Sequence, residues 1–414
     1  MRNAIIICAV ALLIGGLFAS RYLLAADPAA KQTPQQMASV LAGDSNQMGF
    51  NLFRELSNGE KGNVFFSPTS LNMALGMTYN GAAGQTATGI AKAMSLGKLM
   101  PDDTNMGNKA LLDMLKKADP SVELNIVNGI WVDNKCLVLP AFIDTNKAAY
   151  GAEIANMDLT TPAAAKPINE WIAKGTKNKI NNLLKPGDFN INTDMVLANA
   201  VYFKGRWTHP FQEDMTKDGD FTLLDGTMKK VSMMMQTGFF NYLEDDKVQM
   251  IALPYGWKKN LHMNIILPGT AVKAEDIPAL FTLDNWNKWN AAAQKVTRVE
   301  LHLPRINTSY QQTLNDSLKN LGMVDAFTEK ADFSKISGKK GLYISFVRHQ
   351  ATLDLDEQGT EATAATATDF EHQSVVQLDK EIKKMIVDRP FFVVINDNQT
   401  GAILFMGYIK DPQA

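Results

Sequence analysis

The chain has 414 residues, of which 46% are hydrophobic and 20% charged, and this is the composition of a folded globular protein rather than of a disordered or fibrous one. Its 41 basic and 43 acidic residues give a formal net charge of -2, which excludes the strong positive field that nucleic-acid and anionic-membrane binding proteins use. The sequence shows no internal repeat and no linker-like stretch between two halves, so we expect one large domain.

The first 26 residues have the pattern of a secretory signal. Arg2 precedes an apolar run over 4–19, and small residues around Ala26 offer a cleavage site. An uncleaved N-terminal membrane anchor would look similar, because the run is somewhat shorter than a full membrane span. We expect an exported protein, extracellular or periplasmic, with anchoring as the alternative. Cleavage would leave Cys136 as the only cysteine, so that no internal disulfide could form.

Residues 27–41 are expected to be a polar N-terminal segment, followed by a folded domain over 42–414. In chain order, the hydrophobic pattern predicts a helix through Phe50 and Leu56, and Ser67-Pro68 marks the start of the next helix. The other predicted elements are strands at 64–66, 121–135 and 195–207, a helix followed by a loop at 163–184, short strands from 221 onward, helices at 275–293 and 310–322, and a hairpin around NDNQTG at 396–401. Helices come early and strands late, which favours the α+β class.

Motifs for catalysis and for metal binding are missing. The five histidines are scattered and no HExxH or CxxC motif occurs, so we expect no metal site. A GxSxG elbow, a phosphate loop and a GxGxxG fingerprint are also missing, which disfavours hydrolases, kinases and dehydrogenases. Ser67 and Ser70 are better interpreted as a helix cap and a buried hydrogen-bonding group than as nucleophiles.

The stretch 356–373, DEQGTEATAATATDFEHQ, is unusual because a run of small residues lies between acidic ones. Alternate residues of a strand face opposite sides of a sheet. From Thr360 to Phe370 the even positions carry no charge and are mostly Ala or Thr, while the acidic residues occupy odd positions. Such a segment suits a strand inside a sheet, but outside a sheet it buries too little surface to offset its chain entropy. We expect either an exposed loop or an inserted strand, with a flexible linker as the alternative.

Several other stretches match the motifs of one family, in the family's order. They are NVFFSPTSLNMAL (63–75), KGTKNKI (174–180), LANAVYFKGRW (197–207), LHLPRI (301–306), LDEQGTEATAATAT (355–368), MIVDRPFFVVI (385–395) and ILFMGYIKDP (403–412). Over residues 42–412 the chain therefore resembles the serpins, a family of serine protease inhibitors, and is similar to their exported, bacterial-type members.

The resemblance implies an α+β serpin fold with three β-sheets, surrounding helices and an exposed reactive-centre loop at about 357–383. It also implies a mechanism. A target protease attacks the loop as substrate and forms an acyl-enzyme, and the cut loop then inserts into the central sheet and traps the protease before deacylation. The protein would be an irreversible suicide-substrate inhibitor and not an enzyme, with no cofactor and no metal.

The resemblance also implies roles for individual residues. The hinge of the loop corresponds to Glu357, Gly359, Thr360, Ala362, Thr363, Ala364 and Ala365. The residues expected to control opening of the sheet are Ser67, Ser70, Asn199, Trp207, Arg305 and His349. Within this set, Arg305 is placed to pair with Glu357.

Two reactive bonds remain open. Counting forward from Glu357 by the family's usual loop length puts the cut between Gln373 and Ser374. Counting back from Phe391 points instead to Asp379, which corresponds to a loop six residues longer and leaves Leu378-Asp379 as the alternative. The alternation fades after residue 371, which favours Gln373-Ser374.

The expected partner is a target protease, serine or cysteine. No Lys or Arg occurs over 370–379, so elastase-like or chymotrypsin-like targets are favoured over trypsin-like ones, unless Lys380 is used. We expect a monomer that polymerises when destabilised and that binds neither nucleic acid nor a small-molecule cofactor. The alternative is a non-inhibitory serpin that acts as a binding or chaperone protein. Its hinge would usually carry a bulky or charged residue, which Thr360 and Ala362 are not.

Overall fold

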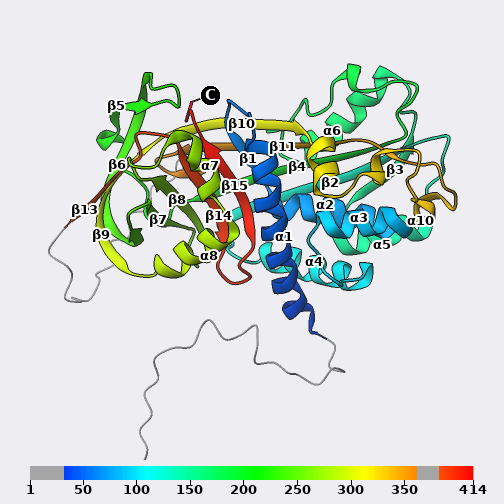
Figure 1. The fold of residues 1–414 in the computed structure, drawn as a ribbon, viewed down its shortest axis with the longest axis horizontal. Coiled ribbons are helices and arrows are strands. Elements are labelled where there is room, and N and C mark those ends of the chain that lie inside the picture. The colour runs from blue at the N-terminus through cyan, green and yellow to red at the C-terminus, as the bar shows by residue number, and fades with distance from the viewer. Residues whose placement is uncertain (1–31, 361–381, 414) are drawn as a thin grey trace, which may run out of the picture. The chain divides into compact units, whose positions relative to one another are not determined.

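The computed structural model describes residues 32–360 and 382–413. The expected leader (1–26) and most of the expected loop (357–383) lie outside the described residues. The helices are α1 (Pro34–Ser57), α2 (Pro68–Gly81), α3 (Gly84–Ala93), α4 (Pro101–Leu115), α5 (Pro140–Tyr150), α6 (Ala165–Gly175), α7 (Ile277–Leu280), α8 (Leu283–Ala292), α9 (Asn315–Leu321) and α10 (Ser334–Ser337) (Figure 1).

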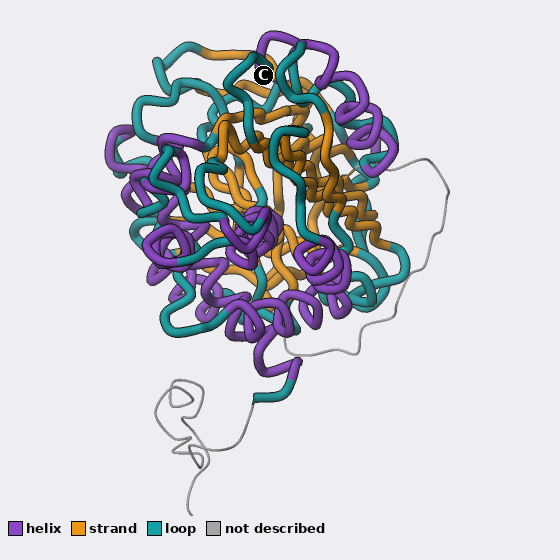
Figure 2. The backbone as a smooth tube through the Cα atoms, turned by 90° about the vertical axis from the view of Figure 1, so that its right-hand side faces the viewer, coloured by secondary structure: helices purple, strands orange, loops and turns teal. Residues whose placement is uncertain are grey.

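The described strands form two sheets, and Figure 2 shows them running through the middle of the body with helices around them. The strands are β1 (Val64–Phe66), β2 (Val122–Asp133), β3 (Glu153–Met157), β4 (Met195–Arg206), β5 (Lys217–Thr222), β6 (Met228–Glu244), β7 (Val248–Tyr255), β8 (Leu261–Pro268), β9 (Val296–Pro304), β10 (Ile306–Thr313), β11 (Ile344–Asp356), β12 (Gly359–Thr360), β13 (Lys383–Ile386), β14 (Phe391–Asp397) and β15 (Ile403–Ile409).

One sheet has six strands in the order β10-β11-β12-β4-β2-β3, and the other has nine in the order β1-β15-β14-β8-β7-β6-β9-β13, with β5 also paired to β6. The resemblance to serpins implied three sheets. Two of them are continuous here because the 17 residues of β6 pair with β5 over 228–233, with β9 over 233–241 and with β7 over 241–244. The α+β class is confirmed.

The main core lies between the two sheets and the helices. β14 and β15 are buried at every residue, and β4 at its first nine, because each lies between covered faces. α2 is buried on nearly all sides and packs beside β4 and β15. A second, smaller core lies on the opposite face of the six-stranded sheet, where α6 packs on the even-numbered residues of β4.

The structure differs from the expected elements at several places. α1 begins at Pro34, inside the segment 27–41 that was expected to be polar, because Met37, Ala38 and Leu41 are buried. β10 continues to Thr313 before α9 starts, because it pairs with β11 along that length, so the helix predicted from 310 was wrong at its start. β11 and the helices α3 to α5 were not predicted. For β11 a signal was present, because its buried residues alternate from Val347 to Leu355.

Candidate functional site

The site lies where the six-stranded sheet begins to separate. β4 and β11 pair directly, in parallel, from Met195 to Val201 on β4 and from Ile344 to Ala351 on β11. Beyond that point β12 lies between them. Thr360 is opposite Gly205 of β4 and Leu355 of β11, and both pairings are antiparallel. The chain that leaves β11 therefore turns back and enters the sheet between its two neighbours.

A tight turn makes this return possible. The Asp356 carboxylate accepts hydrogen bonds from the backbone N–H groups of Gln358 and Gly359, at 2.8 and 3.2 Å. Gly359 has φ +139, and a Cβ there would collide with the backbone of 205–207. Only glycine adopts this conformation readily. Trp207 fixes the turn from the β4 side, with its backbone N–H donating to the Gln358 carbonyl at 3.0 Å and its indole N–H to the Asp356 carbonyl at 3.1 Å.

An ion pair holds the start of the turn. The Arg305 guanidinium donates to both carboxylate oxygens of Glu357, at 2.7 to 3.0 Å, and the Thr216 hydroxyl donates to the same carboxylate. The Glu357 side chain is 3% exposed and that of Arg305 is 45% exposed. Burial alone would raise the pKa of Glu357, but the hydrogen bonds from Arg305 and Thr216 outweigh it and hold that pKa below its usual value. The carboxyl is therefore ionised and paired at neutral pH.

Thr360 points into the core. Its hydroxyl lies 2.7 Å from the Tyr255 hydroxyl, and the Tyr255 ring stacks on Trp207 at 4.4 Å between centroids. Phe203 meets Tyr255 edge-on at 5.1 Å. Thr360 is 1% exposed, so the even positions of the 356–373 stretch begin on the inner face of the sheet, as the alternation predicted.

A second polar cluster lies deeper, where β4 and β11 are paired directly. The Asn199 amide donates to the Ser70 hydroxyl and to the Asn128 side chain, each at 2.5 Å. His349 Nδ1 lies 2.5 Å from the Asn199 side-chain oxygen, and the Ser67 N–H donates to His349 Nε2 at 3.4 Å. Ser67 also caps α2 by accepting from the Ser70 N–H. The cluster thus connects β2, β4 and β11 to the start of α2.

His349 is neutral in this cluster. Its Nε2 accepts from an N–H, so the ring proton is assigned to Nδ1, which donates to Asn199. Complete burial lowers the pKa of His349 to about 3. Protonation of Nε2 would place a second N–H group opposite the Ser67 N–H, so two hydrogen-bond donors would face each other. The folded state therefore excludes the charged form of this histidine.

The structure brings the expected residues together in two groups. Trp207, Arg305, Glu357, Gly359 and Thr360 lie around the turn, and Ser67, Ser70, Asn199 and His349 lie in the deeper cluster. Sequence reasoning missed the further contributors Asn128, Thr216 and Tyr255. Asn128 could have been found, because a polar residue in the middle of a buried strand is unusual. The hinge residues Ala362, Thr363, Ala364 and Ala365 and the reactive-bond residues Gln373, Ser374, Leu378 and Asp379 lie outside the described residues.

The described residues offer neither a metal site nor a membrane-spanning helix. Residues 32–360 and 382–413 contain no group of three or more His, Cys, Asp or Glu side chains that could hold a metal ion. Within the same ranges no helix is both long enough and apolar enough to cross a bilayer. Cys136 is a free, partly buried thiol.

Residues 44–412 match the family model described as serpin (serine protease inhibitor). The chain belongs to the serpin family. It is 32% identical over 382 residues to Serpin B3 of Homo sapiens, covering 88% of this chain and 97% of that protein. It is 33% identical over 382 residues to the leukocyte elastase inhibitor of Sus scrofa, with coverages of 90% and 99%. Human thyroxine-binding globulin complexed with thyroxine has a similar structure, with a TM-score of 0.80, 28% identity and coverages of 92% and 100%.

The serpin fold expected from the sequence is confirmed. These relatives carry names for protease inhibition and for hormone binding. Family membership by itself therefore does not decide between an inhibitor and a binding protein.

We expect the stability of the native form to fall as the pH is lowered through 6.5. The ordinary pKa of histidine is 6.5 and burial lowers that of His349 to about 3. Below pH 6.5 His349 therefore binds a proton in the unfolded state but not in the native state. The loss is about 1.4 kcal/mol per pH unit, or about 2 kcal/mol between pH 6.5 and 5. Urea midpoints of the wild type and of His349→Gln, which stays neutral, would measure it, and equal pH slopes for the two proteins would contradict it.

Glu357→Lys should open the top of the sheet and favour self-polymerisation. Removing one partner of a hydrogen-bonded, partly buried ion pair costs about 2 kcal/mol, and here it also places two cations together. Size-exclusion chromatography after mild heating would show polymers, because an open gap exposes unpaired strand edges. Glu123→Lys breaks a more exposed pair with Lys177 and should leave a monomer. A monomeric, fully active Glu357→Lys protein would contradict the role of this pair.

Proposed function

We propose that this protein is an irreversible protease inhibitor that works by inserting its cleaved loop into the six-stranded sheet. The observation that carries the proposal is β12. Its two residues already pair with β4 on one side and with β11 on the other. The first step of strand insertion is thus present in the intact chain, and neither Gly359 nor Thr360 opposes its continuation.

The register indicates where continued insertion would place the loop. If the pairing of Thr360 with Gly205 and Leu355 were extended, Ala362 would come opposite Phe203 and Leu353, on the inner face. Later even positions would pass the cluster around His349. Large side chains could not enter a core that is already packed, because overpacking is destabilising. The small residues of the hinge fit this requirement.

The same register bears on the reactive bond. β4 begins at Met195 and β11 at Ile344, and extension of the pairing would bring Phe370 opposite Met195 and residue 371 opposite Ile344. A cut after Gln373 would leave only two residues, 372 and 373, beyond the ladder, whereas a cut after Leu378 would leave 372–378. We therefore favour Gln373-Ser374 over Leu378-Asp379.

The two polar groups have separate roles in this proposal. The pair Arg305–Glu357, with Trp207, anchors the hinge at the entrance of the gap. The cluster of Ser67, Ser70, Asn199 and His349 ties β4 to β11 further down, so it has to break before the loop can pass. No member of either group acts as a nucleophile, and the inhibitor needs no cofactor and no metal.

The apolar residues Val375, Val376 and Leu378 favour elastase-like, chymotrypsin-like or cysteine protease targets. A relative named leukocyte elastase inhibitor supports an elastase-like target. The leader-like sequence over 1–26 supports export to an extracellular or periplasmic space, with cleavage or anchoring both open.

The inhibitor should form SDS-stable complexes with at least one protease. We would incubate the pure protein with elastase-like, chymotrypsin-like, trypsin-like, subtilisin-like and papain-like enzymes and weigh the released C-terminal peptide. The expected result is a covalent complex with a cut between Phe370 and Lys380. Loop cleavage without complex for every protease tested would instead support a non-inhibitory serpin, and a cut at Lys380 would overturn the preference against trypsin-like targets.

Thr360→Arg should convert the inhibitor into a substrate. Insertion requires the side chain at this position to lie beside Tyr255, and burying an unpaired guanidinium costs several kcal/mol. Loop cleavage should continue while the yield of covalent complex falls at least about tenfold. Gln358→Arg, in the turn before β12, is the matched control and should keep the yield. Equal yields for Thr360→Arg and the wild type would contradict the insertion mechanism.

A second candidate function, carriage of a small ligand, is favoured by a cavity of about 260 Å³ between the strands β6 to β8 and α8. The cavity is lined mainly by amide side chains and an imidazole, from Asn241, His262, Asn264, Asn290, Gln294 and Asn398. Burial lowers the pKa of His262, so this lining is neutral and suits an uncharged polar molecule. Thyroxine-binding globulin is a relative whose name states such a role. A neutral polar compound that raises the melting temperature, together with failure to trap any protease, would favour this function.

A further inference from the structure

β4 and β11 are also connected far from the hinge, by side chains on the outer face of the sheet. The segment 176–194, between α6 and β4, crosses this face. It reaches β10, where the Gln311 side chain donates to the Leu183 carbonyl at 2.7 Å. It contacts β11 through four side chains, Asp188, Phe189, Phe346 and Arg348, which we call the clasp.

An ion pair is the strongest contact of the clasp. An Arg348 guanidinium N–H donates to Asp188 Oδ1 at 2.7 Å, and the two side chains are 15% and 18% exposed. The other oxygen of Asp188 accepts from the Lys185 N–H at 2.7 Å, which fixes the carboxylate within its own turn. The Arg348 guanidinium also lies 5.6 Å from the centre of the Phe346 ring. The pair is thus oriented at its carboxylate end and largely shielded from water, so removing either partner leaves the other charge without its partner in a partly buried place.

An aromatic contact lies beside the ion pair. Phe189 meets Phe346 edge-on, with 5.8 Å between ring centroids. Both rings belong to the smaller core under α6. Among the described residues of that core, Phe346 comes from β11, whereas the others come from β2, β4, α6 and the segments beside them. One side chain of β11 is therefore packed into a core whose other residues lie on the β4 side of the sheet.

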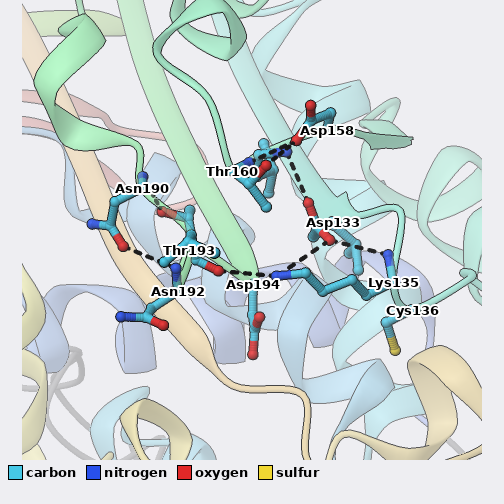
Figure 3. A network of polar contacts seen from close by, with 12 residues as sticks. Asp133, Lys135, Cys136, Asp158, Thr160, Asn190, Asn192, Thr193 and Asp194 are labelled. Carbon is cyan, nitrogen blue, oxygen red and sulfur yellow. Dashed lines mark hydrogen bonds and ion pairs between the residues drawn. The ribbon is translucent and has the colours of Figure 1, made fainter.

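The segment is attached to the β4 side of the sheet through residues that follow β2. The Asp133 carboxylate accepts from the Lys135 backbone N–H, as Figure 3 shows, and the Lys135 ammonium donates to the Ile191 carbonyl at 2.9 Å. Two further bonds cross from its end to the β11 side. The Tyr343 hydroxyl donates to the Asn192 carbonyl at 3.0 Å, and the Asp194 N–H donates to the Ser345 hydroxyl at 2.8 Å.

We propose that the clasp holds the lower half of the sheet closed and limits the rate at which the loop inserts. Neighbouring strands lie about 4.8 Å apart, so one inserted strand moves β11 to about 9.6 Å from β4. Asp188 and Arg348 sit on opposite sides of that gap and cannot stay 2.7 Å apart as it widens. The clasp therefore stabilises the closed form and is lost in the inserted form. Because it acts on insertion, this inference rests on the proposed function.

The test compares two forms of the same protein. The variants are Arg348→Met, which keeps contact with Phe346, Asp188→Asn, which still accepts from the Lys185 N–H, and the double variant. We would measure the urea unfolding of the native form and of the form cleaved in its loop by a protease that is not trapped. The increase of urea resistance with time after cleavage would give the rate at which the native form converts to the inserted form. In each variant we expect the native form to open about fivefold faster and the cleaved form to be unchanged. The two single effects should not add in the double variant.

The ion pair Lys229–Asp411 has the same 2.7 Å contact, with side chains 33% and 26% exposed, does not join β4 to β11 and is the control. Lys229→Met should destabilise both forms equally. Should Asp188→Asn fail to fold, Tyr343→Phe removes a single cross-gap hydroxyl and should show the same selective effect.

Equal loss in both forms, or no loss in the native form, would overturn the clasp. A wild-type protein that gains no stability when its loop is cut would refute insertion itself, and the clasp as a control of it. A wild type that gains stability, with variants that behave like it, would refute the clasp alone.

Discussion

The proposed function depends on one exchange of hydrogen bonds. β4 and β11 satisfy each other's backbone groups through a single parallel ladder, and in the proposed mechanism the loop replaces that ladder with two antiparallel ones, of the kind that β12 makes over two residues. Antiparallel pairing is slightly more favourable per residue than parallel pairing, and two ladders bond twice as many groups of the new strand. If the proposed insertion occurs, the closed sheet is not the best-paired arrangement open to this chain. On that proposal, every contact that joins β4 to β11 directly delays the exchange.

The contacts at the hinge and between β4 and β11 differ in chemistry according to burial. At the hinge and on the outer face they are ion pairs, Arg305–Glu357 and Asp188–Arg348, in which at least one partner keeps some access to water. In the middle, where the sheet is covered on both faces, the bridge is a neutral network centred on Asn199 and His349. Charges at this depth would carry a desolvation cost that their attraction need not repay. The low pKa of His349 is the measure of that constraint.

Much of the fold and part of the site could be predicted from sequence because their signals are local. Alternation over 356–373 predicted that Thr360 faces inward, whereas the pairing of Arg305 with Glu357 was implied only by the resemblance to serpins. Tyr255 and Thr216 could not be found in this way, since each lies in an ordinary strand or turn and meets the hinge only after the two sheets pack. Asp188 and Arg348 are 160 positions apart, and nothing in their surroundings marks them as partners. Contacts of this type, between residues far apart in the sequence, cannot be predicted from local patterns.

β12 also has a role at the top of the sheet. Gly359 and Thr360 pair with Gly205 and Arg206 of β4 and with Leu355 and Asp356 of β11, so at these positions both strands have a backbone partner rather than an open edge. In the proposed mechanism, each pair that the loop gains from residue 364 onward requires a β4–β11 pair to break, because the direct ladder ends at Val201 and Ala351. Resistance would then arise from the ladder, next from the His349 cluster, and last from the contacts near Ser345. The proposed metastability is therefore a property of the order in which contacts break.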